Sequence, residues 1–195
     1  VRPGISLMEK LGQVFVGLRP SALSSIDVEV RGEIAAHDVT VLKLAALKGI
    51  FSRIVSEQVS YVNAPLMAEA RGMEVTLTKD ETSADYRNLL TLRGVLADGS
   101  VVSASATLTG AKQTQKLVGI NGYEVEVPLA SHHIVMMYED RPGIVAVYGK
   151  AFGDASINIA GMQIARDTRG GQALSVLTVD SRVPDELLAE VGAAI

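Results

Sequence analysis

Two short turn sequences, Asp98-Gly99 and Asn121-Gly122, constrain the fold of this chain more than any other feature. Each stands between two apolar runs, residues 89–96 and 101–108 around the first, and residues 117–120 and 123–127 around the second. Asp-Gly and Asn-Gly between such runs are strong signals for β-hairpins. The first part of the chain is therefore predicted to contain an antiparallel sheet, with two hairpin turns of the same kind.

Helices and further strands are predicted before these hairpins. Residues 7–18 place apolar side chains on one helical face, and Pro20 is expected to end that helix. Asp38 is the expected N-cap of a second, mostly apolar helix, and Asn63-Ala64-Pro65 opens a third that ends at Gly72. Strands are expected over residues 26–30, closed by Gly32, and from residue 75. This mixture predicts an α+β domain.

The pattern changes after a short linker at residues 128–131. Strands are expected over residues 134–137, 157–164 and 173–179, with a helix over residues 144–152 and another that Pro184 begins. The order β-α-β-β-α is one strand short of the ferredoxin-like βαββαβ unit. The predicted organisation is an antiparallel-sheet domain over residues 1–129, followed over residues 130–195 by a ferredoxin-like domain lacking its last strand.

Composition excludes several classes of function. The net charge of −4 offers no basic stripe for nucleic acid, and the absence of cysteine excludes disulfides and thiolate chemistry. No apolar run approaches the roughly 20 residues that span a bilayer, so no membrane partner is expected. With no signal peptide at its start, the chain is expected to be cytoplasmic. Both ends of the chain look like interior sequence, which predicts a piece of a longer protein.

The best candidate site is the segment Tyr138-Glu139-Asp140-Arg141-Pro142-Gly143, which joins a strand to a helix, together with Asn158. Gly143 allows a ligand to approach the backbone, and the helix start offers N–H groups that suit a carboxylate. Asp140 is placed to meet an ammonium group, and Tyr138 and Asn158 to donate or accept hydrogen bonds. These features fit an amino acid. The alternative is that Asp140 caps the helix and Asn158 satisfies backbone groups, and spacing alone favours it.

The remaining candidates are weaker. Lys112 and Lys116, helped by Arg87 or Arg93, form a candidate anion site, although a solvated strand edge is favoured. His132 and His133 are adjacent on a strand and point to opposite faces, so no metal site is expected. No serine has a partner His and Asp at a telling position, and no Gly-x-Gly-x-x-Gly follows a strand. No catalytic or cofactor-binding residue is therefore predicted.

Residues 133–183, which contain Tyr138 to Ile144 and Ile157-Asn158-Ile159, resemble an ACT domain. The preceding part contains the stretches 28–33, 44–51 and 120–122, and Tyr61-Val62-Asn63-Ala64-Pro65. This part resembles the intervening, allosteric-substrate-binding domain of the long D-3-phosphoglycerate dehydrogenases of actinobacteria. The resemblance covers essentially the whole chain, and the two domains in this order are more specific than either motif alone.

The resemblance implies a regulatory role in an NAD-dependent enzyme of L-serine biosynthesis, with L-serine bound between paired ACT domains of a dimer or tetramer. Tyr138 and Asp140 would come from one subunit and Asn158 from its neighbour, with the backbone of Pro142, Gly143 and Ile144 facing the ligand. The missing last strand leaves a sheet edge exposed. Lys116 matches a position that holds a second, phosphate-bearing ligand in such enzymes, but Pro128 and Thr178 stand where arginines are expected.

Two other functions stay open. The same pair of domains accompanies iron–sulfur L-serine dehydratases, where it would regulate a lyase. The stretch Val62-Asn63-Ala64-Pro65 favours the dehydrogenase. The third alternative is a module that only holds subunits together and binds no effector.

Overall fold

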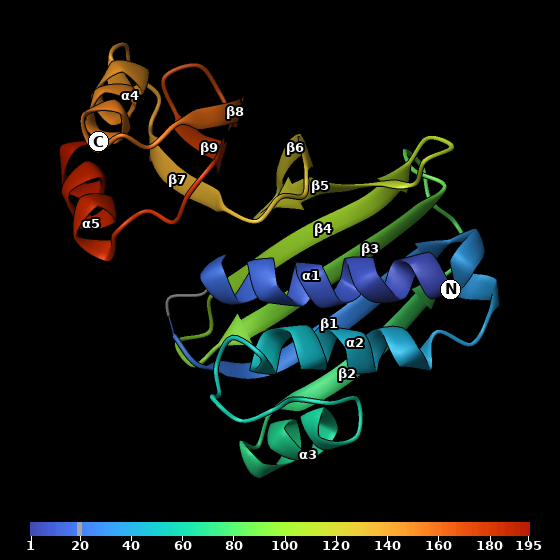
Figure 1. Cartoon of the computed structure of the whole chain (residues 1–195). Helices are drawn as coiled ribbons and strands as arrows, with labels where there is room; N and C mark the ends of the chain where they lie inside the picture. The colour runs from blue at the N-terminus through green and yellow to red at the C-terminus, as the bar shows by residue number, and fades with distance from the viewer. Residues whose placement is uncertain (19–20) are drawn as a thin grey trace. The chain divides into compact units, whose positions relative to one another are not determined.

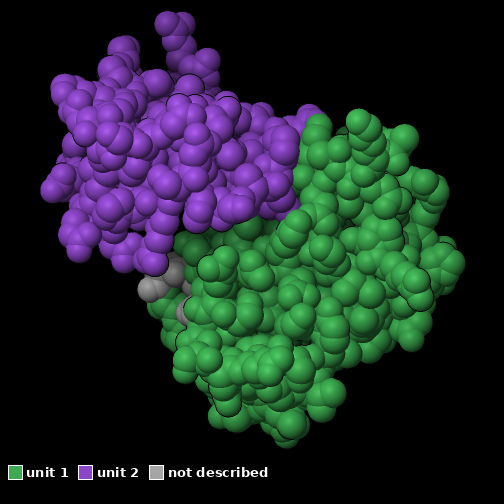
Figure 2. Space-filling model, viewed as in Figure 1, with its two compact units in different colours: residues 1–122 green, residues 123–195 purple. Residues whose placement is uncertain are grey.

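The computed structural model of the chain describes residues 1–18 and 21–195 (Figure 1). Pro20, the expected end of the first helix, lies outside the described residues. The chain divides into two compact units, residues 1–122 and 123–195, shown in green and purple in Figure 2. The predicted domain boundary between residues 129 and 130 stays a prediction.

The first unit is an α+β layer built on a mostly antiparallel sheet, as predicted. Its elements are α1 (Arg2–Leu18), β1 (Leu23–Gly32), the short 3-10 helix η1 (Glu33–Ala36), α2 (Thr40–Phe51), α3 (Asn63–Ala70), β2 (Glu74–Asp80), β3 (Asn88–Leu96), β4 (Val101–Thr109) and β5 (Thr114–Ile120). The strand order is β2-β1-β3-β4-β5. The pair β1–β2 is parallel, whereas β1–β3, β3–β4 and β4–β5 are antiparallel.

The parallel pair follows from the length of the connection between β1 and β2. Parallel neighbours need a crossover of a dozen or more residues, and here the crossover carries α2 and α3. The turn sequences that predict antiparallel hairpins give no signal for this parallel pair of β1 and β2. The sheet is therefore antiparallel around the hairpins and parallel at its outer strand β2.

Helices α1 and α2 lie against one face of the sheet (Figure 1). On β1, Ile26, Val28 and Val30 are buried on this face. The alternate residues Asp27, Glu29 and Arg31 point to the other face, because successive strand residues alternate. The sheet therefore has one apolar face and one polar face.

The two helices approach closely where each carries a glycine. A Cβ added at Gly12 of α1 would lie 2.6 Å from the carbonyl oxygen of Ala46, and one added at Gly49 of α2 would overlap the carbonyl oxygen of Glu9. Both contacts would be shorter than the distance that a Cβ atom and an oxygen allow. The apolar core between helices and sheet thus depends on two positions without side chains.

The two hairpin turns are of different kinds, contrary to the prediction. Asn121 and Gly122 have φ angles of 48° and 85°, as a type I′ turn requires. In the other turn Gly99 has a φ of 84° while Asp98 does not have positive φ. There the Asp98 carboxylate instead accepts the N–H of Ser100 at 2.9 Å. Asp-Gly therefore marks a hairpin correctly without fixing its turn type.

The second unit contains β6 (Tyr123–Pro128), β7 (His133–Glu139), α4 (Ile144–Asp154), β8 (Ile159–Arg166), β9 (Gln172–Val179) and α5 (Asp185–Ala194). Strands β7, β9 and β8 form an antiparallel sheet in that order. From β7 onward the order is β-α-β-β-α, which confirms a ferredoxin-like arrangement without its last strand among the described residues. Its core packs Tyr148, Phe152 and Leu177 without solvent exposure.

Two predicted helix starts are displaced by one residue. Pro184 precedes α5 in an extended conformation, with φ of −59° and ψ of 142°, and Asp185 is the first helical residue. Val39, not Asp38, is the residue before α2, yet the Asp38 carboxylate still accepts the N–H of Thr40 at 3.0 Å. The capping group was therefore identified correctly and its position was wrong. No helix in the described part of the chain is long and apolar enough to cross a membrane.

Candidate functional site

The bend between β7 and α4 presents a carboxylate beside an uncapped helix start. Gly143 precedes α4 with a φ of 95°, a left-handed conformation that favours glycine. Among the described residues no side chain caps this helix. Its first N–H groups carry partial positive charge and lack intrahelical partners. The bend can therefore bind an anionic group.

Asp140 does not cap α4, so the alternative reading of its role as a cap is wrong. Its Oδ2 accepts a hydrogen bond from Arg166 Nη1 at 3.0 Å and one from the N–H of Gly170 at 3.4 Å. These two donors, Arg166 first, hold the pKa of the Asp140 carboxyl below its ordinary value. The side chain of Asp140 is 24% exposed, so the carboxylate stays ionised and within reach of solvent.

Asn158 lies just before β8 and is also engaged by a side chain. Its Nδ2 donates to Asp180 Oδ2 at 2.7 Å, while its carbonyl oxygen accepts the N–H of Asp180 at 3.2 Å. The Asn158 side chain therefore bonds a carboxylate and not main-chain groups. The alternative, in which it only satisfies backbone groups, is wrong. Asn158 is exposed to solvent.

The structure does not bring Asp140 and Asn158 together within one chain. The N–H of Asp140 donates to the carbonyl of Gly171 at one end of β9, whereas Asn158 pairs with Asp180 at the other end. Asp180 lies nine positions after Gly171 along extended chain, which is a distance on the order of 30 Å. A small ligand that touches both side chains has to bind between two copies of the chain.

Tyr138 lies in the core of the second unit. Its hydroxyl lies 2.5 Å from Ser175 Oγ, and its ring centroid lies 6.4 Å from that of Tyr148. Both hydroxyl groups are buried, and each satisfies the other. The structure thus gives Tyr138 a packing role, and its predicted contact with a ligand stays a prediction.

The three remaining predicted site residues at the bend divide between solvent and core. Pro142 and Gly143 are exposed, whereas the side chain of Ile144 is buried and holds the start of α4 on the sheet. Only the backbone of Ile144 can therefore face a ligand. That the bend contributes main-chain groups to a ligand stays a prediction.

The predicted anion site in the first unit is less well formed. Lys112 lies in the exposed turn between β4 and β5, and Lys116 lies on β5 opposite Thr107. Arg87 is occupied by Glu33 at 2.7 Å, and Arg93 lies on β3 with Asp27 as its partner on β1. Binding of a phosphate-bearing ligand by the two lysines stays a prediction.

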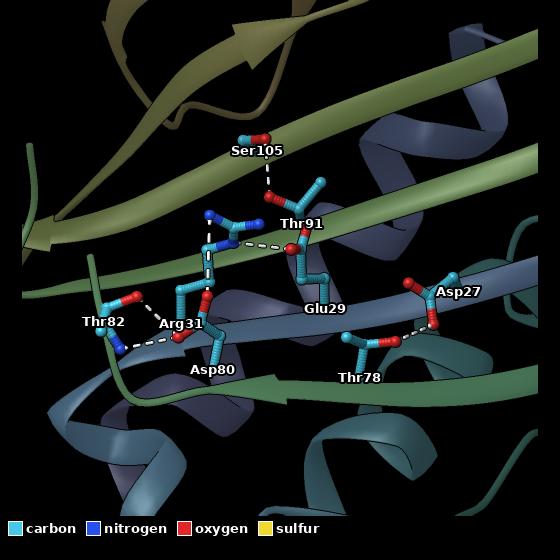
Figure 3. A network of polar contacts seen from close by, with 8 residues as sticks. All are labelled: Asp27, Glu29, Arg31, Thr78, Asp80, Thr82, Thr91 and Ser105. Carbon is cyan, nitrogen blue, oxygen red and sulfur yellow. Dashed lines mark hydrogen bonds and ion pairs between the residues drawn. The ribbon is translucent and has the colours of Figure 1, made fainter. Parts of the chain in front are cut away.

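The polar face of the sheet in the first unit carries a side-chain network (Figure 3). Arg31 lies between Glu29, at 2.6 Å, and Asp80, at 3.9 Å. Asp27 accepts hydrogen bonds from the hydroxyl groups of Thr76 and Thr78 at 2.6 and 2.9 Å. Because acids and bases pair within the network, it has the character of a stabilising surface and not of a ligand site.

His133 is held by two neighbours and is not grouped with other metal-binding side chains. Its Nε2 accepts the N–H of Ala130 at 2.9 Å, and its Nδ1 lies 3.3 Å from the hydroxyl of Thr178. Burial lowers its pKa. In the described part of the chain no three His, Asp or Glu side chains are grouped so that they could hold a metal ion.

Sequence reasoning missed Arg166, Asp180 and Ser175, which contact the predicted site residues. Arg166 and Tyr138 both have Ala173 as their register partner, one on each side of β9. That relation exists only once the strand order is known. The sequence held one signal for this pairing. A positively charged residue, Arg166, closely follows the predicted strand over residues 157–164 and can pair with the negative charge of Asp140.

The chain matches two family models. Residues 1–121 match the D-3-phosphoglycerate dehydrogenase intervening domain, and residues 132–195 match the ACT domain. These matches confirm the two-domain resemblance drawn from the sequence.

Relatives with the name D-3-phosphoglycerate dehydrogenase cover nearly all of the chain. The protein of Mycobacterium tuberculosis (strain ATCC 25618 / H37Rv) is 38% identical over 195 residues, which is 100% of this chain and 37% of the relative. The protein of Synechocystis sp. is 31% identical over 192 residues, 98% of this chain and 34% of the relative. The protein of Archaeoglobus fulgidus is 31% identical over 191 residues, which is 97% of this chain and 36% of the relative. The chain thus spans little more than a third of the length of these relatives.

Proposed function

Because this chain belongs to the family of D-3-phosphoglycerate dehydrogenase intervening domains and carries an ACT domain after it, we propose that it is the regulatory region of a D-3-phosphoglycerate dehydrogenase and senses L-serine. In this proposal the dehydrogenase oxidises 3-phosphoglycerate with NAD, and L-serine inhibits it as the end product. No residue of this chain is assigned to NAD or to the oxidation. The names of the relatives favour this function over regulation of an L-serine dehydratase.

The observation that supports the proposal most is the Asp140 carboxylate in the same bend as the uncapped start of α4. An amino acid carries an ammonium group for the first and a carboxylate for the second. The backbone at Pro142, Gly143 and Ile144 lies between them. A ligand with only one of these charges would leave half of the bend unused.

The separation of Asp140 and Asn158 along β9 supports a site shared by two copies. Asp140, with Tyr138, belongs to one copy and Asn158 to the neighbouring copy, in a dimer or tetramer. L-serine then favours the arrangement of the two copies that completes the site, because a ligand shifts an equilibrium only by binding one state better. Feedback inhibition follows if that arrangement is the less active one.

Titration calorimetry of the chain with L-serine tests the proposal. We expect stereoselective binding close to one L-serine per chain, with D-serine and glycine as controls. Asp140→Ala removes the carboxylate and is expected to abolish binding while the oligomeric state, followed by sedimentation, stays unchanged. If the wild-type chain associates with a second copy and still binds no L-serine, the proposal is contradicted.

A second candidate function, assembly without an effector, has its own supporting observation. Met162 and Ile164 are 49% and 41% exposed on β8, the outer strand of its sheet. Apolar side chains side by side on an outer strand favour contact with another copy. If assembly is the whole function, neither the wild type nor Asp140→Ala gives heat on titration with L-serine, and both associate equally. This result distinguishes the two candidates.

A further inference from the structure

Each polar side chain assigned to the effector already has a partner within its own chain. Arg166 donates to Asp140, and Asp180 accepts from Asn158. The first pairing concerns the ammonium group directly, because a guanidinium and an ammonium are both cations that donate hydrogen bonds to a carboxylate. The position expected for the ligand's ammonium group is thus taken by a protein cation.

The geometry lets Arg166 occupy this position without being fixed there. Arg166 is the last residue of β8, and its side chain crosses the end of β9 to reach Asp140 beyond β7. The Arg166 side chain is 58% exposed. An exposed ion pair contributes little free energy, because water solvates both partners well. The guanidinium can therefore leave the carboxylate and turn into solvent when another cation arrives.

The other contacts of Asp140 do not depend on Arg166. The N–H of Gly170 also reaches Oδ2, and the N–H of Asp140 itself donates to the carbonyl of Gly171 at 2.8 Å. The carboxylate thus keeps its place at the end of β9 when the arginine leaves. When Arg166 leaves, the Asp140 carboxylate is already oriented to accept a hydrogen bond from another cation.

We propose that Arg166 is an internal competitor of the effector's ammonium group, so that it sets the affinity of the site for ligands that bring a cation of their own. This inference rests on the proposed function and extends it to a residue that touches Asp140. The carboxylate of Asp180 holds the Asn158 amide in the same manner, but Arg166 carries the inference because its charge matches the group that it replaces.

The test is calorimetry of the full chain and of Arg166→Met with two ligands, L-serine and glycerate, in which a hydroxyl replaces the ammonium group. Removing the competitor is expected to tighten L-serine binding by roughly two- to fivefold, the range set by one exposed ion pair. Glycerate does not compete with Arg166 and is expected to gain nothing. Arg166→Lys keeps a cation in reach and is expected to lie between the two.

Arg182→Met is the matched control, because Arg182 forms an exposed pair with Asp185 at 3.8 Å in the same unit as Arg166. It is expected to leave L-serine affinity unchanged. If wild type binds L-serine and Arg166→Met binds it equally or more weakly, the inference is wrong while the proposed function stands. An equal gain for glycerate also overturns the inference, since it indicates a general loosening. If no variant binds L-serine although the chains associate, the proposed function itself fails.

Discussion

At the scale of single residues, Tyr138 has a structural role that its place in a site motif did not indicate. Its hydroxyl is buried against Ser175 Oγ. Tyr138→Phe removes this bond, and Ser175 keeps only the longer contact of 3.5 Å with Tyr148. We expect a loss of about 1 kcal/mol in the free energy of unfolding, measured in urea. Unchanged L-serine affinity would assign Tyr138 to the core, whereas a large loss of affinity with native stability would assign it to the ligand.

His133 gives the stability of the second unit a defined pH dependence. Its lowered pKa, caused mainly by burial, means that the unfolded chain takes up the proton at a higher pH than the folded protein. Stability is therefore full above the unfolded value of about 6.5 and falls as the pH drops through that value toward the folded pKa. Protonation also prevents Nε2 from accepting the N–H of Ala130.

Unfolding followed at a series of pH values checks this expectation. His133→Gln is expected to remove the decline below pH 6.5, while His37→Gln, in the first unit, is expected to retain it. In the wild type, the protection of the Ala130 amide against hydrogen exchange, taken relative to its intrinsic rate at each pH, is expected to decrease as the pH falls. A decline that persists unchanged in His133→Gln would show that other groups cause it.

At the scale of elements, the contact between α1 and α2 depends on the absence of a side chain at Gly49. A methyl group there would overlap the carbonyl of Glu9, and backbone cannot turn aside as a side chain can. Gly49→Ala is expected to lower the free energy of unfolding by about 1–3 kcal/mol or more, the usual cost of overpacking. A methyl group at Gly17, on the other helix α1, would meet nothing within 4 Å, so Gly17→Ala is the comparison. It is expected to be neutral or stabilising by up to about 1 kcal/mol. Equal effects of the two substitutions, compared by urea denaturation, would refute the close contact.

The elements themselves could mostly be predicted, because their signals are local. Alternation on β1, helical spacing on α1 and the Asn121-Gly122 turn each lie within a few residues. The parallel pairing of β2 could not be predicted, since it depends on how residues 33–73 cross back over the sheet. Helix starts were displaced by one residue, because a capping side chain such as Asp38 can act from a neighbouring position.

The site was predictable as a set of residues and not as a geometry. Asp140 and Asn158 carry recognisable motifs, but their separation along β9 and their partners Arg166 and Asp180 depend on strand order. Tyr138 illustrates the limit. The side chain stands two residues from Asp140 in the sequence, yet the strand directs it into the core.

At the scale of the whole molecule, the positions of Asp140 and Asn158 predict complementation between two inactive variants. In the proposed pair of copies, one shared site would take Asp140 from the first copy and Asn158 from the second, and the other site would take them the opposite way. Mixing Asp140→Ala chains with Asn158→Ala chains therefore rebuilds one intact site in each mixed pair. The other site of that pair carries both substitutions.

Calorimetry of the mixture after subunit exchange checks this arrangement. We expect L-serine binding to return with native affinity at a reduced number of sites, although neither variant binds alone. A mixture of Asp140→Ala with wild type serves as the reference for exchange. If the mixture of the two variants stays silent while exchange is shown to be complete, the two residues do not form a site shared between two copies.

The span of β9 has a further consequence for how such a sensor responds to its own abundance. When each half of a binding site belongs to a different copy, dilution of the protein separates the halves and weakens the apparent affinity for the ligand, while ligand in turn draws the copies together. Sensitivity to the effector then rises with the amount of protein present. Production of the regulated enzyme and its susceptibility to restraint would be coupled by mass action alone, with no dedicated control of expression.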